Sequence, residues 1–177
     1  MTRFARSRWT IPALMIGALA VNGLGAEAQP AKASAAAPAK PGTVTGTLTV
    51  GGTPVTLTHA YVAGPIDGDK YVVELTDQAL PEAALASELK FGGGQGLLRS
   101  GKAQGLFLYV DAKGFVVTAI PFAGEVRGNK MLSSVGSLPS FKVAAGQVTG
   151  TGKMTTDDTN QGWSYQAQFT ATVRPVK

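Results

Sequence analysis

The only histidine of the chain, His59, is the side chain best suited to acid–base chemistry near neutral pH. It stands between Leu57 and Tyr61 in a run that alternates apolar and polar residues. A catalytic triad would require an activated serine beside the histidine, and a metal site would require further ligands. No sequence motif provides either at a recognisable spacing. We interpret His59 as a partly buried structural residue and keep it as a candidate ligand-binding residue.

Carboxylates are the next groups that could do chemistry. Two acidic pairs, Asp67-Gly68-Asp69 and Asp157-Asp158, resemble fragments of a calcium site. Calcium needs several converging oxygens, whereas Asp and Gly favour ordinary turns without any metal. We therefore predict turns at both places and no metal site. Glu74 differs because it stands on a predicted strand within an otherwise apolar run, and it is a second candidate ligand-binding residue.

Aromatic side chains recur where strand alternation requires a buried residue, which indicates a core. A buried tyrosine hydroxyl or indole N–H still needs a polar partner, and this leaves room for a small ligand. The candidate ligand-binding residues are therefore His59, Tyr61, Glu74, Tyr109 and Trp163. The sequence predicts no catalytic residue and no cofactor.

Strands must position these candidate side chains. The clearest sign of strands is a hairpin over residues 43–63. Gly51-Gly52 is a dipeptide that accepts the positive φ angles of a two-residue hairpin turn. Counting back from that turn puts Val50 opposite Thr53, Gly46 opposite Leu57 and Val44 opposite His59. This register would place His59 on the inward face.

Further strands are predicted from alternating or apolar runs at residues 71–76, 106–111, 115–121, 148–154 and 163–173. The second and third of these runs are apolar on both faces, which is typical of strands in the middle of a structure. One helix is predicted to begin at Pro81, with Leu85 and Leu89 on one face. The glycine-rich stretch 91–105 predicts a loop, with at most a trace of strand at Leu97-Leu98. The fold class is therefore mainly β, an antiparallel β-sandwich or barrel-like variant of seven to nine strands with one short helix.

The amino-terminal residues predict export. Three arginines precede an apolar run, and Ala26-Glu27-Ala28 has the small residues that a signal peptidase reads. We predict a signal peptide over residues 1–28, a flexible linker rich in Ala, Pro and Lys over 29–41, and a single domain over 42–177. The mature chain would be periplasmic or secreted, with no stable membrane span. The chain has no cysteine, so its stability cannot depend on disulfides.

The basic charge of the chain comes mainly from the amino-terminal region. Without Arg3, Arg6, Arg8, Lys32, Lys40 and Glu27, the formal net charge falls from +5 to +1. The remaining Lys and Arg residues are scattered, whereas nucleic-acid binding requires a clustered basic surface. We predict no nucleic-acid partner.

The segments GTLTVGGTPVTLTHAYV and YVVELTDQAL, within residues 46–80, resemble the opening of an uncharacterised family of exported bacterial proteins. The run from Gly162 to Phe169 is also similar. The resemblance implies a β-fold and a bacterial origin. It implies no catalytic or binding residue.

These observations favour a non-enzymatic binding or interaction module of the cell envelope, whose partner is a protein, an envelope component or a small ligand. Two alternatives stay open. A lipocalin-like carrier would have a closed barrel with a cavity lined by aromatic residues. A hydrolase would bring His59 together with carboxylates or a serine in a cleft.

Overall fold

The computed structural model describes residues 42–87 and 94–176, which belong to one compact unit, residues 36–177. The predicted signal peptide and linker lie outside the described residues. The elements, in chain order, are β1 (Gly42–Val50), β2 (Thr53–Ile66), β3 (Lys70–Thr76), α1 (Glu82–Ser87), α2 (Gln95–Ser100), β4 (Gly105–Asp111), β5 (Val116–Ala123), β6 (Val126–Arg127), β7 (Leu132–Ser133), β8 (Lys142–Ala144), β9 (Gln147–Met154), α3 (Thr156–Thr159) and β10 (Trp163–Arg174).

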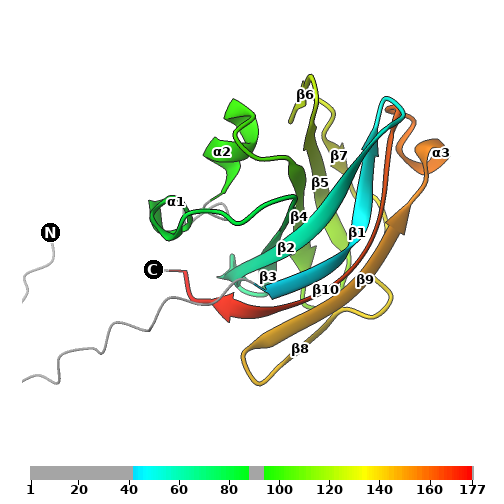
Figure 1. Ribbon diagram of the computed structural model, residues 1–177. Helices are drawn as coiled ribbons and strands as arrows, with labels where there is room; N and C mark the ends of the chain where they lie inside the picture. Colours follow the sequence, from blue (N-terminus) through cyan, green and yellow to red (C-terminus); the bar gives the residue numbers. More distant parts are fainter. Residues whose placement is uncertain (1–41, 88–93, 177) are drawn as a thin grey trace, which may run out of the picture. The chain divides into compact units, whose positions relative to one another are not determined.

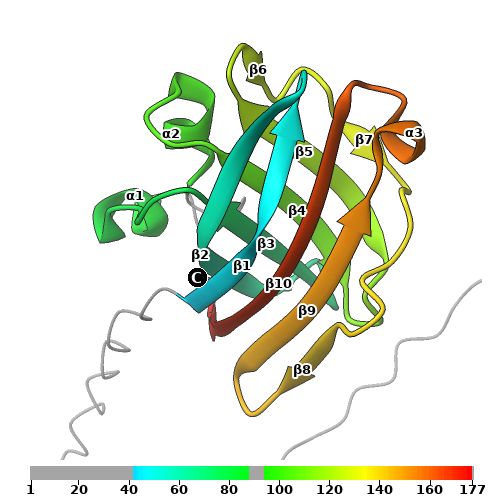
Figure 2. The same ribbon diagram turned by 45° about the vertical axis from the view of Figure 1, so that its right-hand side comes forward.

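The strands form one ten-stranded sheet in the order β6-β5-β4-β3-β2-β1-β10-β9-β8, with β7 beside β5. Neighbouring strands are antiparallel, and the end of β10 also runs parallel to β2, pairing Val173 with Val62. Figures 1 and 2 show the sheet curling so that β4 and β5 lie behind β1, β10 and β9. The mainly β, antiparallel fold is confirmed. The described residues contain ten strands and three short helices, and the sheet does not close into a barrel.

The concave side of the sheet carries the inner core. It consists of apolar side chains from β1 to β5, β9 and β10, among them Leu48, Leu57, Leu75, Leu108 and Phe169. All five are essentially inaccessible to solvent. Burial of this apolar surface supplies the main driving force for folding in a chain without disulfides.

A second cluster, the outer core, lies on the convex side of β2 to β5 and beneath α1 and α2. It includes Val72, Leu85, Leu98, Phe107 and Phe122. Strands β3, β4 and β5 therefore carry buried apolar residues on both faces, which confirms the prediction from the apolar runs in β4 and β5. Figure 1 shows both helices on this side of the sheet.

The register of the first hairpin agrees with the prediction from Val50–Thr53 as far as Gly46–Leu57, and then departs from it. A bulge makes Thr43, rather than Val44, the partner of His59. A Cβ at Gly46 would lie 2.4 Å from the carbonyl oxygen of Gln166, so only glycine allows β1 to approach β10 this closely. Because the register shifts between Gly46 and Thr43, the predicted inward position of His59 is wrong. Ala60 takes the inner face instead.

The segment predicted as a glycine-rich loop contains the helix α2, which corrects the sequence interpretation. The helix is only six residues long, and its end is set by Gly101, whose φ of 74° terminates the helical conformation. Leu98 is fully buried in the outer core. Because so short a helix has little stability of its own, packing on the sheet decides its conformation. Residues 91–93 of the stretch lie outside the described residues.

Strands β9 and β10 follow the predicted alternation along their length. Their inward residues are buried, and nearly all of their outward residues are exposed. Between them, α3 begins with a capping box in which Thr155 and Asp158 exchange hydrogen bonds. These bonds from Thr155 hold the pKa of Asp158 below its usual range. The acidic pair at 157–158 therefore lies in the first turn of a short helix, where the sequence had predicted only a turn.

Candidate ligand-binding groove

A groove of about 370 Å³ lies on the convex side of the sheet, next to α2. Its floor consists of apolar side chains from four strands, Ile66, Val72, Phe107 and Ile120. These side chains lie on the outward face because the opposite positions of the same strands fill the inner core. The sheet therefore presents an apolar floor at a place that the helices do not fully cover. The volume lies in the range of known small-molecule sites.

Polar side chains surround this floor. Gln95 and Arg99 come from α2, Asp67 from the β2–β3 turn, Tyr109 from β4 and Thr118 from β5. Gln95 and Arg99 are four residues apart and share one helix face, where the Arg99 guanidinium lies 3.4 Å from the Gln95 side-chain oxygen. Arg99 forms no ion pair with any described residue. The groove thus combines an apolar floor with a cation that can receive an anionic group.

A hydrogen bond between two rim residues orders one part of the groove. The hydroxyl of Tyr109 donates to Oδ2 of Asp67 at 2.9 Å. Asp67 occupies the left-handed region with φ of 48°, a conformation that Asp and Asn tolerate. Burial, followed by the hydrogen bond to Asp67 and its charge, raises the pKa of Tyr109 from 10.0 to about 12.

Replacing Asp67 by Asn is expected to lower the pKa of Tyr109 toward 10. The amide keeps an acceptor for the hydroxyl but removes the negative charge that opposes tyrosinate formation. In the native protein Tyr109 stays protonated at pH values where the unfolded chain ionises, so its contribution to stability is present below pH 10 and is lost as pH rises through the folded pKa of about 12.

The measurement is an alkaline titration of tyrosinate absorbance. Glu125→Gln, which removes an exposed carboxylate outside the groove, is the matched control and should leave the titration unchanged. An identical titration of the wild type and Asp67→Asn would contradict the assigned contact.

Two of the sequence candidates, Tyr61 and Glu74, face each other across β2 and β3 in the outer core. Glu74 is fully buried, and its Oε1 accepts a hydrogen bond of 3.1 Å from the N–H of Gly94, just before α2. The hydroxyl of Tyr61 accepts one of 2.8 Å from the N–H of Leu80. Burial is the main reason that the pKa of Tyr61 is raised. Both residues therefore attach the helical segment to the sheet.

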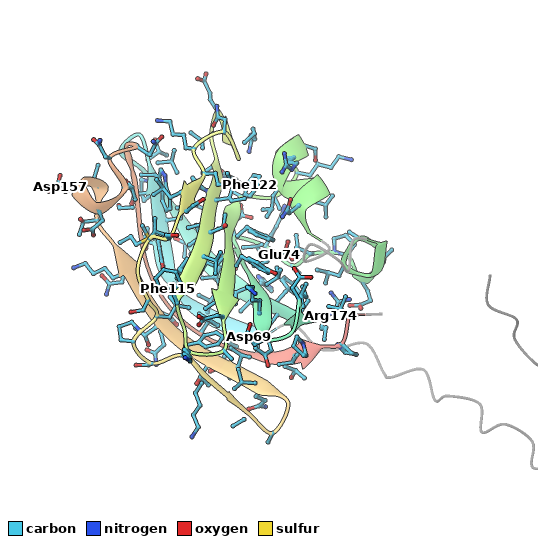
Figure 3. All side chains as sticks on the ribbon, turned by 180° about the vertical axis from the view of Figure 1, so that it is seen from behind. Asp69, Glu74, Phe115, Phe122, Asp157 and Arg174 are labelled. Carbon is cyan, nitrogen blue, oxygen red and sulfur yellow. The ribbon has the colours of Figure 1, made fainter. Side chains whose placement is uncertain are left out.

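Arg174, at the end of β10, also connects the sheet to the helical segment, as Tyr61 and Glu74 do. Its guanidinium donates to Glu82 Oε1 at 3.0 Å and to the carbonyl oxygen of Leu85 at 3.3 Å, both in α1. Figure 3 shows Glu74 and Arg174 on the side of the sheet that carries the helices, away from Asp157. These polar contacts hold α1 and α2 on the convex face and so maintain one wall of the groove.

His59 lies apart from the groove, on β2 opposite Thr76. Its Nδ1 is 2.8 Å from the hydroxyl of Thr58, which donates its proton to the carbonyl oxygen of Asp77. A hydroxyl has one proton, so Nδ1 must carry the hydrogen in its bond to Thr58. Within the described residues the imidazole has no hydrogen bond to a carboxylate or a serine. Thr58 thus links the imidazole to the backbone of Asp77.

Trp163 lies in the inner core, where its ring is stacked on that of Tyr165 with 6.4 Å between centroids. Its indole nitrogen has no hydrogen-bond partner among the described residues. Of the five sequence candidates, only Tyr109 lines the groove. Arg99 and Gln95 were missed because α2 was predicted as a loop, and Thr118 was not singled out although it lies on a predicted strand. Gln95 and Arg99 are four residues apart, a spacing that places two side chains on one face only if the segment is a helix.

No group of three or more potential metal ligands exists in residues 42–87 and 94–176. Every helix that the structure describes is too short to cross a lipid bilayer. Comparisons with protein-family models, with curated proteins and with solved structures find no match to this chain. The assignment of function therefore depends on the groove and on the chemistry of its lining.

Proposed function

We propose that this protein is a non-enzymatic, exported binding protein that holds a small amphipathic anion in the groove beside α2. The observation that carries the proposal is the pairing of an apolar floor, formed by Phe107 and Ile120 with their neighbours, with a guanidinium, Arg99, at its edge. Export rests on the composition of residues 1–28 and is part of the proposal.

The chemistry of the lining defines the ligand. A compact apolar body, aromatic or branched, would lie over Phe107 and Ile120, and its burial would supply most of the binding free energy. A carboxylate or sulfonate would lie at Arg99, which can donate two parallel hydrogen bonds to such a group. A ligand with this chemistry needs no reaction at the site.

Two fluorescent probes that differ mainly in charge can test this. 1-Anilinonaphthalene-8-sulfonate carries an anion on an apolar body, and N-phenyl-1-naphthylamine has a similar body without the charge. Replacing Arg99 by Gln is expected to weaken binding of the sulfonate about fivefold, the effect of roughly 1 kcal/mol at an exposed cation, and to leave the uncharged probe unchanged. Thr118→Phe, which fills the groove, should abolish binding of both probes.

Lys113→Gln is the matched control, because it removes one positive charge from the exposed β4–β5 turn and leaves the groove intact. Its affinities should equal those of the wild type. Sulfonate binding that survives Thr118→Phe would place the probe elsewhere and refute the proposal. Equal effects of Arg99→Gln and Lys113→Gln would refute the specific role of Arg99.

A further inference from the structure

The convex face of β1, β10 and β9 has an unusual composition. Its exposed outward positions are residues 43, 45 and 47 in β1, 147, 149, 151 and 153 in β9, and 166, 168, 170 and 172 in β10. Every one of these side chains except Lys153 is threonine or glutamine. We call this surface the threonine–glutamine face. Exposed β positions commonly carry charges that prevent association, and this face has one cation and no carboxylate.

The face is a regular array of hydrogen-bonding groups. Strand pairing places Thr45, Gln168 and Thr151 in one row and Thr47, Gln166 and Lys153 in the next. Neighbouring strands lie about 4.8 Å apart, and successive outward residues of one strand about 6.7 Å apart. Each row offers a hydroxyl and an amide, which both donate and accept hydrogen bonds. The threonine methyl groups provide small apolar contacts between them.

Two hollows in this part of the sheet meet at the same two residues. One, of about 370 Å³, is lined by residues that include Thr45, Thr151 and Gln168, and the other, of about 340 Å³, by Thr49, Ser164 and Lys153. Thr47 and Gln166 line both. The hollows are therefore adjacent, and a chain molecule lying across them would contact Gln166 from both sides.

We propose that the threonine–glutamine face binds an uncharged polysaccharide strand, with consecutive sugar rings in the two hollows. A sugar ring presents hydroxyl groups that donate and accept hydrogen bonds around small C–H surfaces, which complements the array of hydroxyls, amides and methyls. The lack of carboxylates and the single ammonium give no basis for recognising a highly charged partner. This site is distinct from the groove beside α2, and neither proposal depends on the other.

The test uses the uncharged oligosaccharides cellohexaose, maltohexaose, laminarihexaose and hexa-N-acetylchitohexaose at millimolar concentration, with the amide NMR shifts of the protein as readout. We expect one of them to shift amides of residues 45–47, 151–153 and 164–168. Gln166→Ala should weaken that binding about tenfold, because it removes the amide common to both hollows. Thr172→Ala, on the same face but outside the hollows, should leave the affinity within about twofold.

Arg99→Gln should not change oligosaccharide binding. A failure of the polysaccharide proposal can therefore be distinguished from a failure of the groove proposal. The absence of shifts on this face with all four oligosaccharides would overturn the inference. Concentration-dependent shifts without sugar, removed by Gln166→Ala, would also overturn it and assign the face to a second copy of the chain.

Discussion

Replacing Trp163 by Ala is expected to lower the free energy of unfolding by about 3–5 kcal/mol, the usual cost of deleting a fully buried aromatic side chain. Trp163 is only 1% exposed, and its ring packs on Tyr165 within the inner core. The loss combines the transfer free energy of the indole with the cavity that the rigid sheet cannot close. Urea unfolding followed by far-ultraviolet circular dichroism measures it.

Phe115→Ala is the matched control for this substitution. It also deletes an aromatic ring, but Phe115 is 41% exposed and should cost less than about 1 kcal/mol. If Trp163 served a ligand rather than the core, its loss would change binding and leave the unfolding midpoint near that of the wild type. Such a result would contradict its placement in the inner core.

Replacing Gly46 by Ala is expected to destabilise the fold by about 2–4 kcal/mol although it adds only one methyl group. The new Cβ would lie 2.4 Å from the carbonyl oxygen of Gln166 and 2.6 Å from the Cα of Ala167. Both are backbone atoms of β10, so no side-chain rotation relieves the contact, and β1 must move away from its partner.

Thr45→Ala is the control, because it changes the neighbouring outward residue without entering the strand interface, and it should stay within about 0.5 kcal/mol of the wild type. Amide NMR shifts in the Gly46 variant should spread along β1 and β10. A Gly46→Ala protein as stable as Thr45→Ala would show that β1 and β10 accommodate the methyl group, and would contradict the role given to this glycine.

The two proposed sites use the same sheet in different ways. Beneath α2, apolar outward residues of β3 to β5 form the floor of the groove. In β1, β9 and β10 the exposed outward residues are polar, and none of the described helices covers them. Because the inner core fills the concave side, both binding surfaces lie on the convex side of the curled sheet.

Local patterns in the sequence predicted most of the strands. Gly51-Gly52 takes the positive φ angles that a primed turn requires, and the alternation from Trp163 to Val173 describes β10 along its length. A turn depends on the φ preferences of its residues, and an alternating strand depends on which of its faces is exposed to solvent. Both properties are encoded within a few residues. The apolar character of β4 and β5 on both faces correctly indicated that something must cover each side.

Only the tertiary structure decided what lies on the convex face and where the candidate site is. The helix α2 forms because Leu98 can be buried on the sheet. The glycines around it favoured a loop, and the local sequence contains no helix signal strong enough to predict otherwise. A register shift between Thr43 and Gly46 in the pairing of β1 with β2 moved His59 away from the inward position predicted for it. Gly46 itself is required by the close approach of β10, more than a hundred residues further along the chain. The sequence by itself therefore determined most of the strands and, except where β2 shifts its register, their faces. Contacts between distant segments decided α2, the groove and its Arg99, because a six-residue helix is stable only through packing.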